Sequence, residues 1–130
     1  MRPHIRFELS WRGASVCVER AERVAVDIRV EHAGRLLVVR EDDLPAPRGA
    51  DLDVRAEGLW LSLVCETPDE HWTVGLEAFA LAVDHPDDER GDLVPLGLDI
   101  EWEAPGRVTG ELLVGDERIE LDEPSSLDVS

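Results

Sequence analysis

Apolar and polar residues alternate along most of this chain. Between His4 and Trp11, isoleucine, phenylalanine, leucine and tryptophan occupy every second position, and histidine, arginine, glutamate and serine lie between them. Arg23–Val30 repeats the pattern, with valine and isoleucine on one side and aspartate and arginine on the other. Strict alternation is typical of a β-strand that buries one face. We therefore expect mainly strands, separated by short turns at glycine and proline.

The same period defines ten strand candidates. Leu52–Arg55 and Leu59–Glu66 could also form one strand that bends at Gly58, since glycine weakens a strand interior. In Trp72–Val83 three alanines would suit a helix, but the alternation favours a strand. The expected strands are His4–Trp11, Ser15–Glu19, Arg23–Val30, Leu36–Arg40, Leu52–Arg55, Leu59–Glu66, Trp72–Val83, Val94–Glu103, Arg107–Val114 and Arg118–Leu121.

Eight to ten short strands predict an all-β fold, either an antiparallel barrel or a sandwich. With 130 residues the chain is long enough for one domain with its own core. We expect the domain to span residues 1–122, and the acidic residues 123–130 to form a flexible tail. Leu59–Val64 and Trp72–Val83 are apolar on both faces, which predicts either that one face lines a cavity while the other packs against a second layer or subunit, or a sandwich with a covered outer sheet.

The charge balance excludes several function classes. The sequence has 30 acidic and 13 basic residues, for a formal net charge of −17, and it contains neither lysine nor tyrosine. This charge repels the phosphates of nucleic acids and anionic lipid surfaces, so we expect no nucleic-acid and no membrane partner. Without lysine no side-chain Schiff base can form, and without tyrosine no phenol can transfer a proton.

Neither the first residues nor the cysteines indicate export. The N-terminal residues lack the apolar core of a signal peptide, and no apolar stretch is long enough to cross a bilayer. Cys17 and Cys65 both lie in apolar runs, which predicts buried, reduced thiols rather than a disulfide. We expect a cytoplasmic protein.

The segment Glu66–Val83 sets ionisable groups against an apolar run. His71 and Glu77 share one face of the expected strand, about 20 Å apart at the usual rise per residue. Each would act alone or with a group on a neighbouring strand, such as Asp99 or Glu101. Glu77 is our candidate general acid, because desolvation by apolar neighbours favours a neutral carboxylic acid. The alternative is that Glu77 pairs with an arginine and is structural.

Aromatic residues provide a candidate pocket for a hydrophobic ligand. The candidate ligand-binding residues are Trp60, Trp72, Trp102, Phe79 and Glu66. Tryptophan more commonly packs in a core, and this alternative stays open.

The sequence predicts neither a metal site nor a cofactor. The four histidines share no short spacing, and the acidic stretch 84–89 lacks the fixed ligand order of a calcium-binding loop. Two cysteines cannot form an all-cysteine zinc site. The chain also has no glycine-rich phosphate loop and no serine in a glycine-flanked nucleophile motif.

The runs His71–Ala80, Val94–Glu103 and Gly110–Leu121 resemble, in order and spacing, the lipocalin-like proteins related to hydroxyneurosporene synthase (carotenoid hydratase). The resemblance covers roughly residues 59–121, one of the two lipocalin-like halves that such proteins carry. It implies a lipocalin-like barrel that acts on an isoprenoid or polyene. Because a lone half leaves its mating surface uncovered, we expect a homodimer.

Three function classes follow from these observations. The first is a β-barrel with a hydrophobic pocket that acts on a polyketide or isoprenoid-type small molecule, as a cyclase, isomerase or hydratase that works mainly by holding its substrate in a reactive fold. The second is a non-catalytic carrier of a hydrophobic ligand. The third is an interaction module that pairs with a second chain, and an interior filled by the protein's own side chains would favour it.

Overall fold

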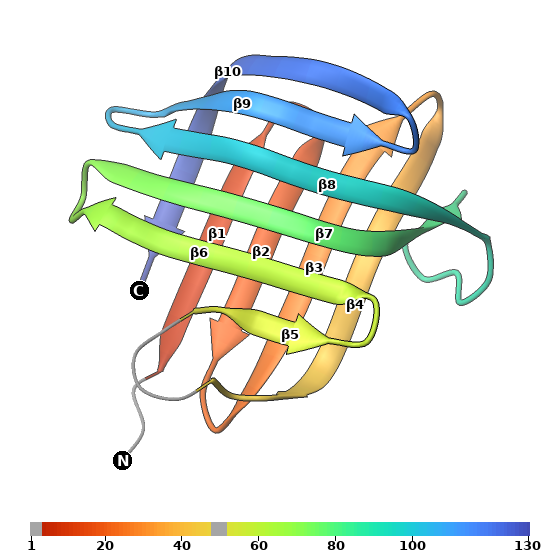
Figure 1. The fold of residues 1–130 in the computed structure, drawn as a ribbon, viewed down its shortest axis with the longest axis horizontal. Coiled ribbons are helices and arrows are strands. Elements are labelled where there is room, and N and C mark those ends of the chain that lie inside the picture. The colour runs from red at the N-terminus through yellow and green to blue at the C-terminus, as the bar shows by residue number, and fades with distance from the viewer. Residues whose placement is uncertain (1–3, 48–51) are drawn as a thin grey trace.

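The computed structural model describes residues 4–47 and 52–130, which form ten β-strands and, within those ranges, no helix (Figure 1). The all-β prediction is confirmed. The strands are β1 (Ile5–Trp11), β2 (Ala14–Arg20), β3 (Arg23–His32), β4 (Arg35–Pro45), β5 (Val54–Ala56), β6 (Leu59–Thr67), β7 (His71–Val83), β8 (Asp92–Glu103), β9 (Arg107–Val114) and β10 (Glu117–Val129).

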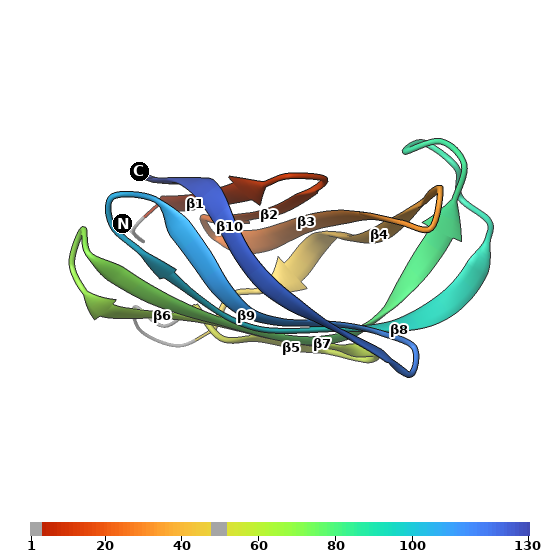
Figure 2. The same cartoon turned by 90° about the horizontal axis from the view of Figure 1, so that it is seen from above.

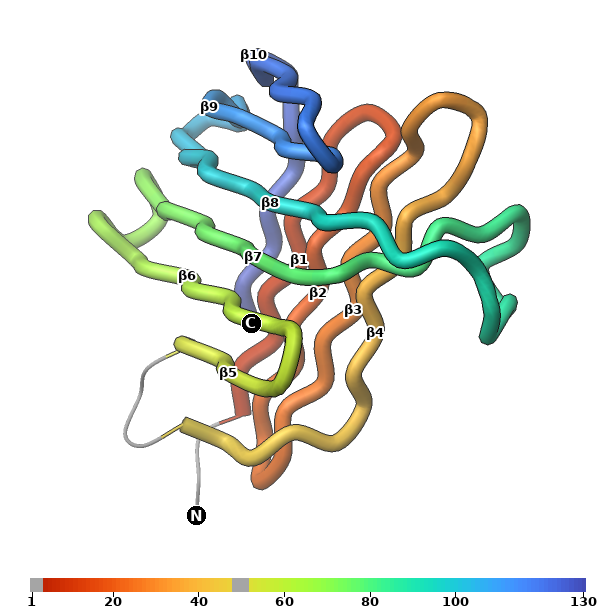
Figure 3. Tube along the Cα trace, turned by 45° about the vertical axis from the view of Figure 1, so that its right-hand side comes forward, coloured from red at the N-terminus to blue at the C-terminus, as the bar shows by residue number. Residues whose placement is uncertain are grey.

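All ten strands belong to one antiparallel sheet in the order β4-β3-β2-β1-β10-β9-β8-β7-β6-β5. A further pairing between β4 and β7 closes eight of them into a ring, and β6 and β5 branch from it. One edge of β7 makes this possible: it pairs with β6 as far as Ala78 and with β4 from Leu81 to Val83. Figure 3 shows β7 running from beside β6 towards β4.

The ring is flattened into two layers, with β1–β4 in one and β5–β9 in the other (Figure 2). The long strand β10 belongs to both. It pairs with β9 as far as Pro124 and with β1 from Ser125 onwards. The expectation of a flexible tail at 123–130 is therefore wrong. Half-buried and exposed residues alternate through this segment, which pairs with β9 at Glu123 and Pro124 and with β1 from Ser125 to Val129.

The space between the layers holds a continuous apolar core to which every strand from β1 to β9 contributes. Phe7, Leu9, Ile28, Leu61, Leu76 and Ile100 are among its largest fully buried side chains. Phe7 of β1 packs on Trp72 of β7, with ring centroids 5.1 Å apart, and so joins the two layers. Ile119, Leu121 and Leu127 of β10 pack against this core and are partly buried.

Two turn regions refine the sequence predictions. Residues 54–67 form two strands rather than one, because β5 and β6 pair antiparallel around a turn at Glu57 and Gly58, where Gly58 has a φ of +73°. Strand β4 continues five residues beyond the predicted end at Arg40, to Pro45, with an irregular register opposite Val24 and Val26. The sequence also predicts a loop at Pro45, Pro47 and Gly49; in the structure Pro45 ends β4, and Gly49 lies outside the described residues. The described part of the chain contains no helix long and apolar enough to cross a membrane.

Candidate functional site

An apolar groove of about 580 Å³ lies on the outer face of β6–β9, the face turned away from the core. Trp60, Glu77, Gly97 and Leu113 form a single row across the four strands, because the register pairs each with the next. We call this hollow the outer groove. It is lined by Ala56, Gly58, Leu59, Trp60, Glu77, Ala78, Phe79, Pro95, Leu96, Gly97, Leu113 and Gly115.

Two glycines let the side chains of the groove lie close to the sheet. A Cβ at Gly75 would be 3.0 Å from Cη2 of Trp60, so the indole lies over that glycine. A Cβ at Gly97 would be 3.1 Å from Cδ1 of Leu113, which lies over Gly97 in the same way. Both distances are below ordinary van der Waals contact, so larger residues would displace the aromatic and aliphatic lining.

Phe79 separates the outer groove from a second hollow. This hollow, which we call the acidic groove, has a volume of about 590 Å³ and lies between β4, the β5–β6 turn and the β7–β8 loop. Phe79 lines both grooves and is 59% exposed, and Leu93, which lines the acidic groove, is 70% exposed. Such large apolar side chains at the surface, in contact with two hollows, are typical of a binding site.

Glu77 lines the outer groove but is exposed. We had expected an apolar enclosure that would desolvate its carboxylate, and this expectation is wrong because the residue faces outward from β7. Among the described residues Glu77 also has no arginine partner: Arg29 pairs with Asp27, and Arg107 with Asp122. The outer face leaves the carboxylate free to be solvated by water.

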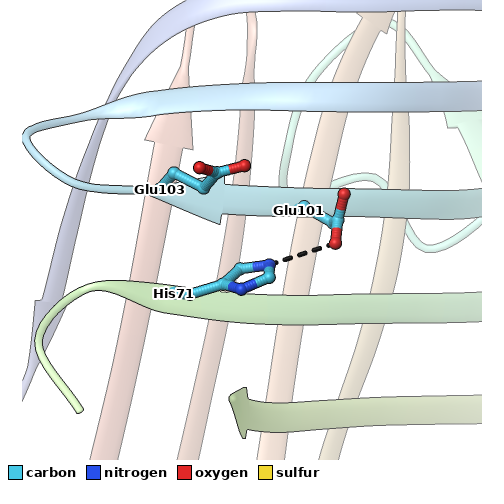
Figure 4. A group of neighbouring side chains, drawn as sticks. All are labelled: His71, Glu101 and Glu103. Atoms are coloured by element: carbon cyan, nitrogen blue, oxygen red, sulfur yellow. Dashed lines mark hydrogen bonds and ion pairs between the residues drawn. The ribbon is translucent and has the colours of Figure 1, made fainter. Parts of the chain in front are cut away.

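His71 lies at the other end of the same face, in a polar cluster (Figure 4). Its Nε2 atom is 3.0 Å from Oε1 of Glu101, and Glu103 is its direct partner across the β7–β8 pair. His71, Glu101 and Glu103 can each offer one ligand atom, and these atoms all lie within 4.8 Å of one another. Imidazole and carboxylate groups are ligand types that zinc and manganese accept.

This cluster was not found from the sequence, because strand register rather than sequence spacing brings its members together. From the sequence, Glu101 is only one of two candidate partners for His71, the other being Asp99. Glu66, predicted to bind ligand, lies beside the same cluster and accepts a 3.0 Å hydrogen bond from the Thr73 hydroxyl. Glu66 is therefore not part of the outer groove.

The three predicted tryptophans do not share a pocket. Trp60 faces outward, whereas Trp72 and Trp102 are partners across β7–β8 and face the core. Trp102 is 7% exposed and Trp72 packs on Phe7. Both also border a separate hollow of about 430 Å³ beside Leu127. The expectation of one aromatic pocket is wrong, because strand parity puts Trp60 and Trp72 on opposite faces of the sheet.

Both cysteines are free, but neither is buried in the core. Cys65 is exposed at an irregularity in the β6–β7 register, and Cys17 is partly exposed on the outer face of β2. Partial burial raises the pKa of the Cys17 thiol, and the nearby charge of Arg6 opposes this rise. The prediction of buried thiols is wrong for two reasons: Cys17 occupies an outward position between Val16 and Val18, and Cys65, opposite Trp72, lies at the exposed end of the inward row of β6.

Comparisons with protein-family models, curated protein sequences and solved structures found no match to this chain. The resemblance to carotenoid hydratase-related proteins therefore stays a prediction.

Proposed function

We propose that this protein is a non-enzymatic binding domain that docks apolar side chains of a partner protein in the outer groove. The observation that carries the proposal is the position of Trp60, Phe79 and Leu113, which face outward beside the exposed Leu93. Exposed apolar groups of this kind are stabilised when a partner removes them from water.

The packing of the interior supports a surface site. The inward side chains of both layers form one apolar core with many members fully buried. Sites for small molecules usually enclose most of the ligand surface. A molecule in the outer groove would rest on the face of a sheet and leave one side in water. A polypeptide can cover such a face and exclude the water itself.

The arrangement of the ionisable groups also favours binding over catalysis. Glu77 is exposed, and His71 is six residues away along an extended strand and bonded to Glu101. The two predicted catalytic groups are therefore about 20 Å apart, too far to act on one bond.

A carrier of a hydrophobic small molecule is the second candidate. A volume of about 580 Å³ lies within the range of small-molecule sites, and two aromatic residues line it. A neutral apolar dye, N-phenyl-1-naphthylamine, tests this candidate directly. Saturable binding at one site that Phe79→Ser weakens by about tenfold or more would favour the carrier.

Selection of peptides from a random display library, with the wild-type protein as bait, tests the proposed function. We expect enriched peptides to bind Phe79→Ser about tenfold or more weakly than the wild type. Val129→Ser is the matched control, since Val129 is 41% exposed on β10, away from the groove. Peptides that bind wild type and Phe79→Ser equally well would refute the proposal, and so would a selection that enriches none.

A further inference from the structure

The chemistry of the partner follows from the charges around Phe79. Among the described residues, Glu77 is the one charged side chain that lines the outer groove. In the acidic groove one arginine faces five carboxylates: the charged residues there are Arg40, Glu41, Asp42, Glu57, Asp88 and Glu89. Phe79 thus lies between two hollows whose charged side chains, within the described part of the chain, are six acids and one base.

Arg40, the single base, does not neutralise the carboxylates of the acidic groove. Nε of Arg40 lies 3.5 Å from Oδ2 of Asp27, so its charge is directed to the β3 side. Within residues 4–47 and 52–130, no arginine or histidine forms an ion pair with Glu41, Asp42, Glu57, Glu77 or Glu89. Carboxylates close to an apolar surface of low dielectric attract cations more strongly than isolated surface carboxylates do.

We infer that the partner segment is basic: apolar side chains occupy the outer groove and cover Phe79, and arginine or lysine side chains beside them meet the acidic groove. The inference rests on the proposed function and adds the charge of the partner to it. Charge complementarity of this kind mainly sets specificity and the rate of association, while the apolar contacts supply most of the affinity.

The same carboxylates disfavour a second copy of this chain as the occupant of the outer groove. Two copies that met at Phe79 would bring their unpaired carboxylates together, and each copy has a formal net charge of −17. Like charges placed opposite each other across an interface oppose association. The homodimer that we expect from the sequence would therefore have to form through a different surface.

Three short synthetic peptides with the same leucine pattern test the inference, with arginine, glutamine or glutamate at the positions between the leucines. Fluorescence anisotropy gives the Kd of each at low and high salt, about 50 mM and about 500 mM NaCl. We expect the arginine peptide to bind about tenfold more tightly than the glutamine peptide at low salt, and the advantage to shrink at high salt.

Two charge-matched variants distinguish the effect of the carboxylates at the acidic groove from the effect of the protein's overall negative charge. Glu57→Gln/Glu89→Gln removes two carboxylates at the acidic groove, and Glu22→Gln/Glu31→Gln removes two exposed carboxylates elsewhere. We expect the first variant to reduce the arginine advantage about threefold or more, and the second to leave it nearly unchanged. Equal effects of the two variants would overturn the inference, because the attraction would then follow net charge alone.

The outcomes also distinguish this inference from the proposed function. If the arginine and glutamine peptides bind equally and both lose affinity in Phe79→Ser, the inference fails and the binding domain stands. If Phe79→Ser binds all peptides as the wild type does, the proposed function fails. Sedimentation of the protein alone tests whether a second copy of the chain occupies the groove. A dimer with a Kd in the micromolar range that Phe79→Ser dissociates would assign the groove to a second copy and overturn the inference.

Discussion

The two layers of the barrel present very different outer faces to solvent. On β1–β4 the outward side chains are charged and paired: Arg6 lies 3.1 Å from Glu19, and both Arg29 and Arg40 contact Asp27. On β6–β9 the outward side chains near Phe79 are aromatic, aliphatic or glycine, with Glu77 as the one charged member of the row. Both layers follow the same alternation, so the alternation by itself does not distinguish a solvated face from a binding face.

The difference separates surface residues that keep an outer face hydrated from surface residues that the fold does not require. A lattice of arginine and carboxylate pairs keeps β1–β4 hydrated and discourages association at that face. Trp60, Phe79 and Leu113 contribute little to the core, because they point away from it. The partner that we propose would give these three side chains a role that folding does not.

The largest expected effect compares the only two phenylalanines of the chain. Phe7 is fully buried and Phe79 is 59% exposed. We expect Phe7→Ala to lower the free energy of unfolding by about 3–5 kcal/mol, because it leaves a cavity against Trp72. Phe79→Ala should change it by about 0.5 kcal/mol or less, because water already reaches the ring.

Urea denaturation of both variants measures the two values. A loss of several kcal/mol in Phe79→Ala would break the comparison, since it would make the outer face part of the structural core.

A smaller effect tests the paired face through pH. A hydrogen bond with His4, together with the charge of Arg6, holds the pKa of Glu19 below its ordinary value of 4.5. Since the folded state holds this proton less tightly than the unfolded chain, ionised Glu19 stabilises the fold above pH 4.5, and the contribution is lost as the pH falls below it.

Thermal unfolding of the wild type and Glu19→Gln over this range should therefore show a shallower loss of Tm with acid in the variant, and added salt should reduce the difference. Parallel Tm curves would mean that the ion pairs of this face are too well solvated to affect stability.

The smallest effect uses the two cysteines, which lie in different layers, Cys17 on β2 and Cys65 on β6. Cys65 is exposed and Cys17 is partly buried with a raised thiol pKa. Because the thiolate is the reactive form, Cys17 should react more slowly than Cys65 with Ellman's reagent at pH 8. Cys17→Ser and Cys65→Ser assign the two phases. A fast phase that is lost in Cys17→Ser would contradict the assignment.

The local pattern of residues predicted the strands well but not what surrounds them. The alternation correctly placed His71, Gly75, Glu77 and Phe79 on one face of β7 and Trp72 on the other. It did not show which face is inside, because both faces are apolar in this strand. For the same reason Glu77 was assigned to an enclosed site that does not exist.

The rest depends on pairings between distant strands. Pro95, Gly97 and Leu113 join Trp60 in the outer groove only because β8 and β9 follow β7 in a particular register. The acidic composition of residues 123–130 hid a strand, since the alternation there uses Glu123, Ser125 and Leu127 as its half-buried positions. Side-chain polarity predicted disorder, and backbone pairing with β1 overrides it.

The pairing of β1 with β10 also sets an order of events during synthesis. Phe7 is opposite Val129, so β1 acquires one of its two neighbours only when nearly all of the described chain is available. Until then β1 has an open edge on which other strands can pair. Contacts so distant in sequence slow folding, because a long loop must close before they form. A ribosome-bound chain would therefore hold two nearly complete layers before β10 joins them. During that time the open edge of β1 makes the protein most prone to pair with other polypeptides.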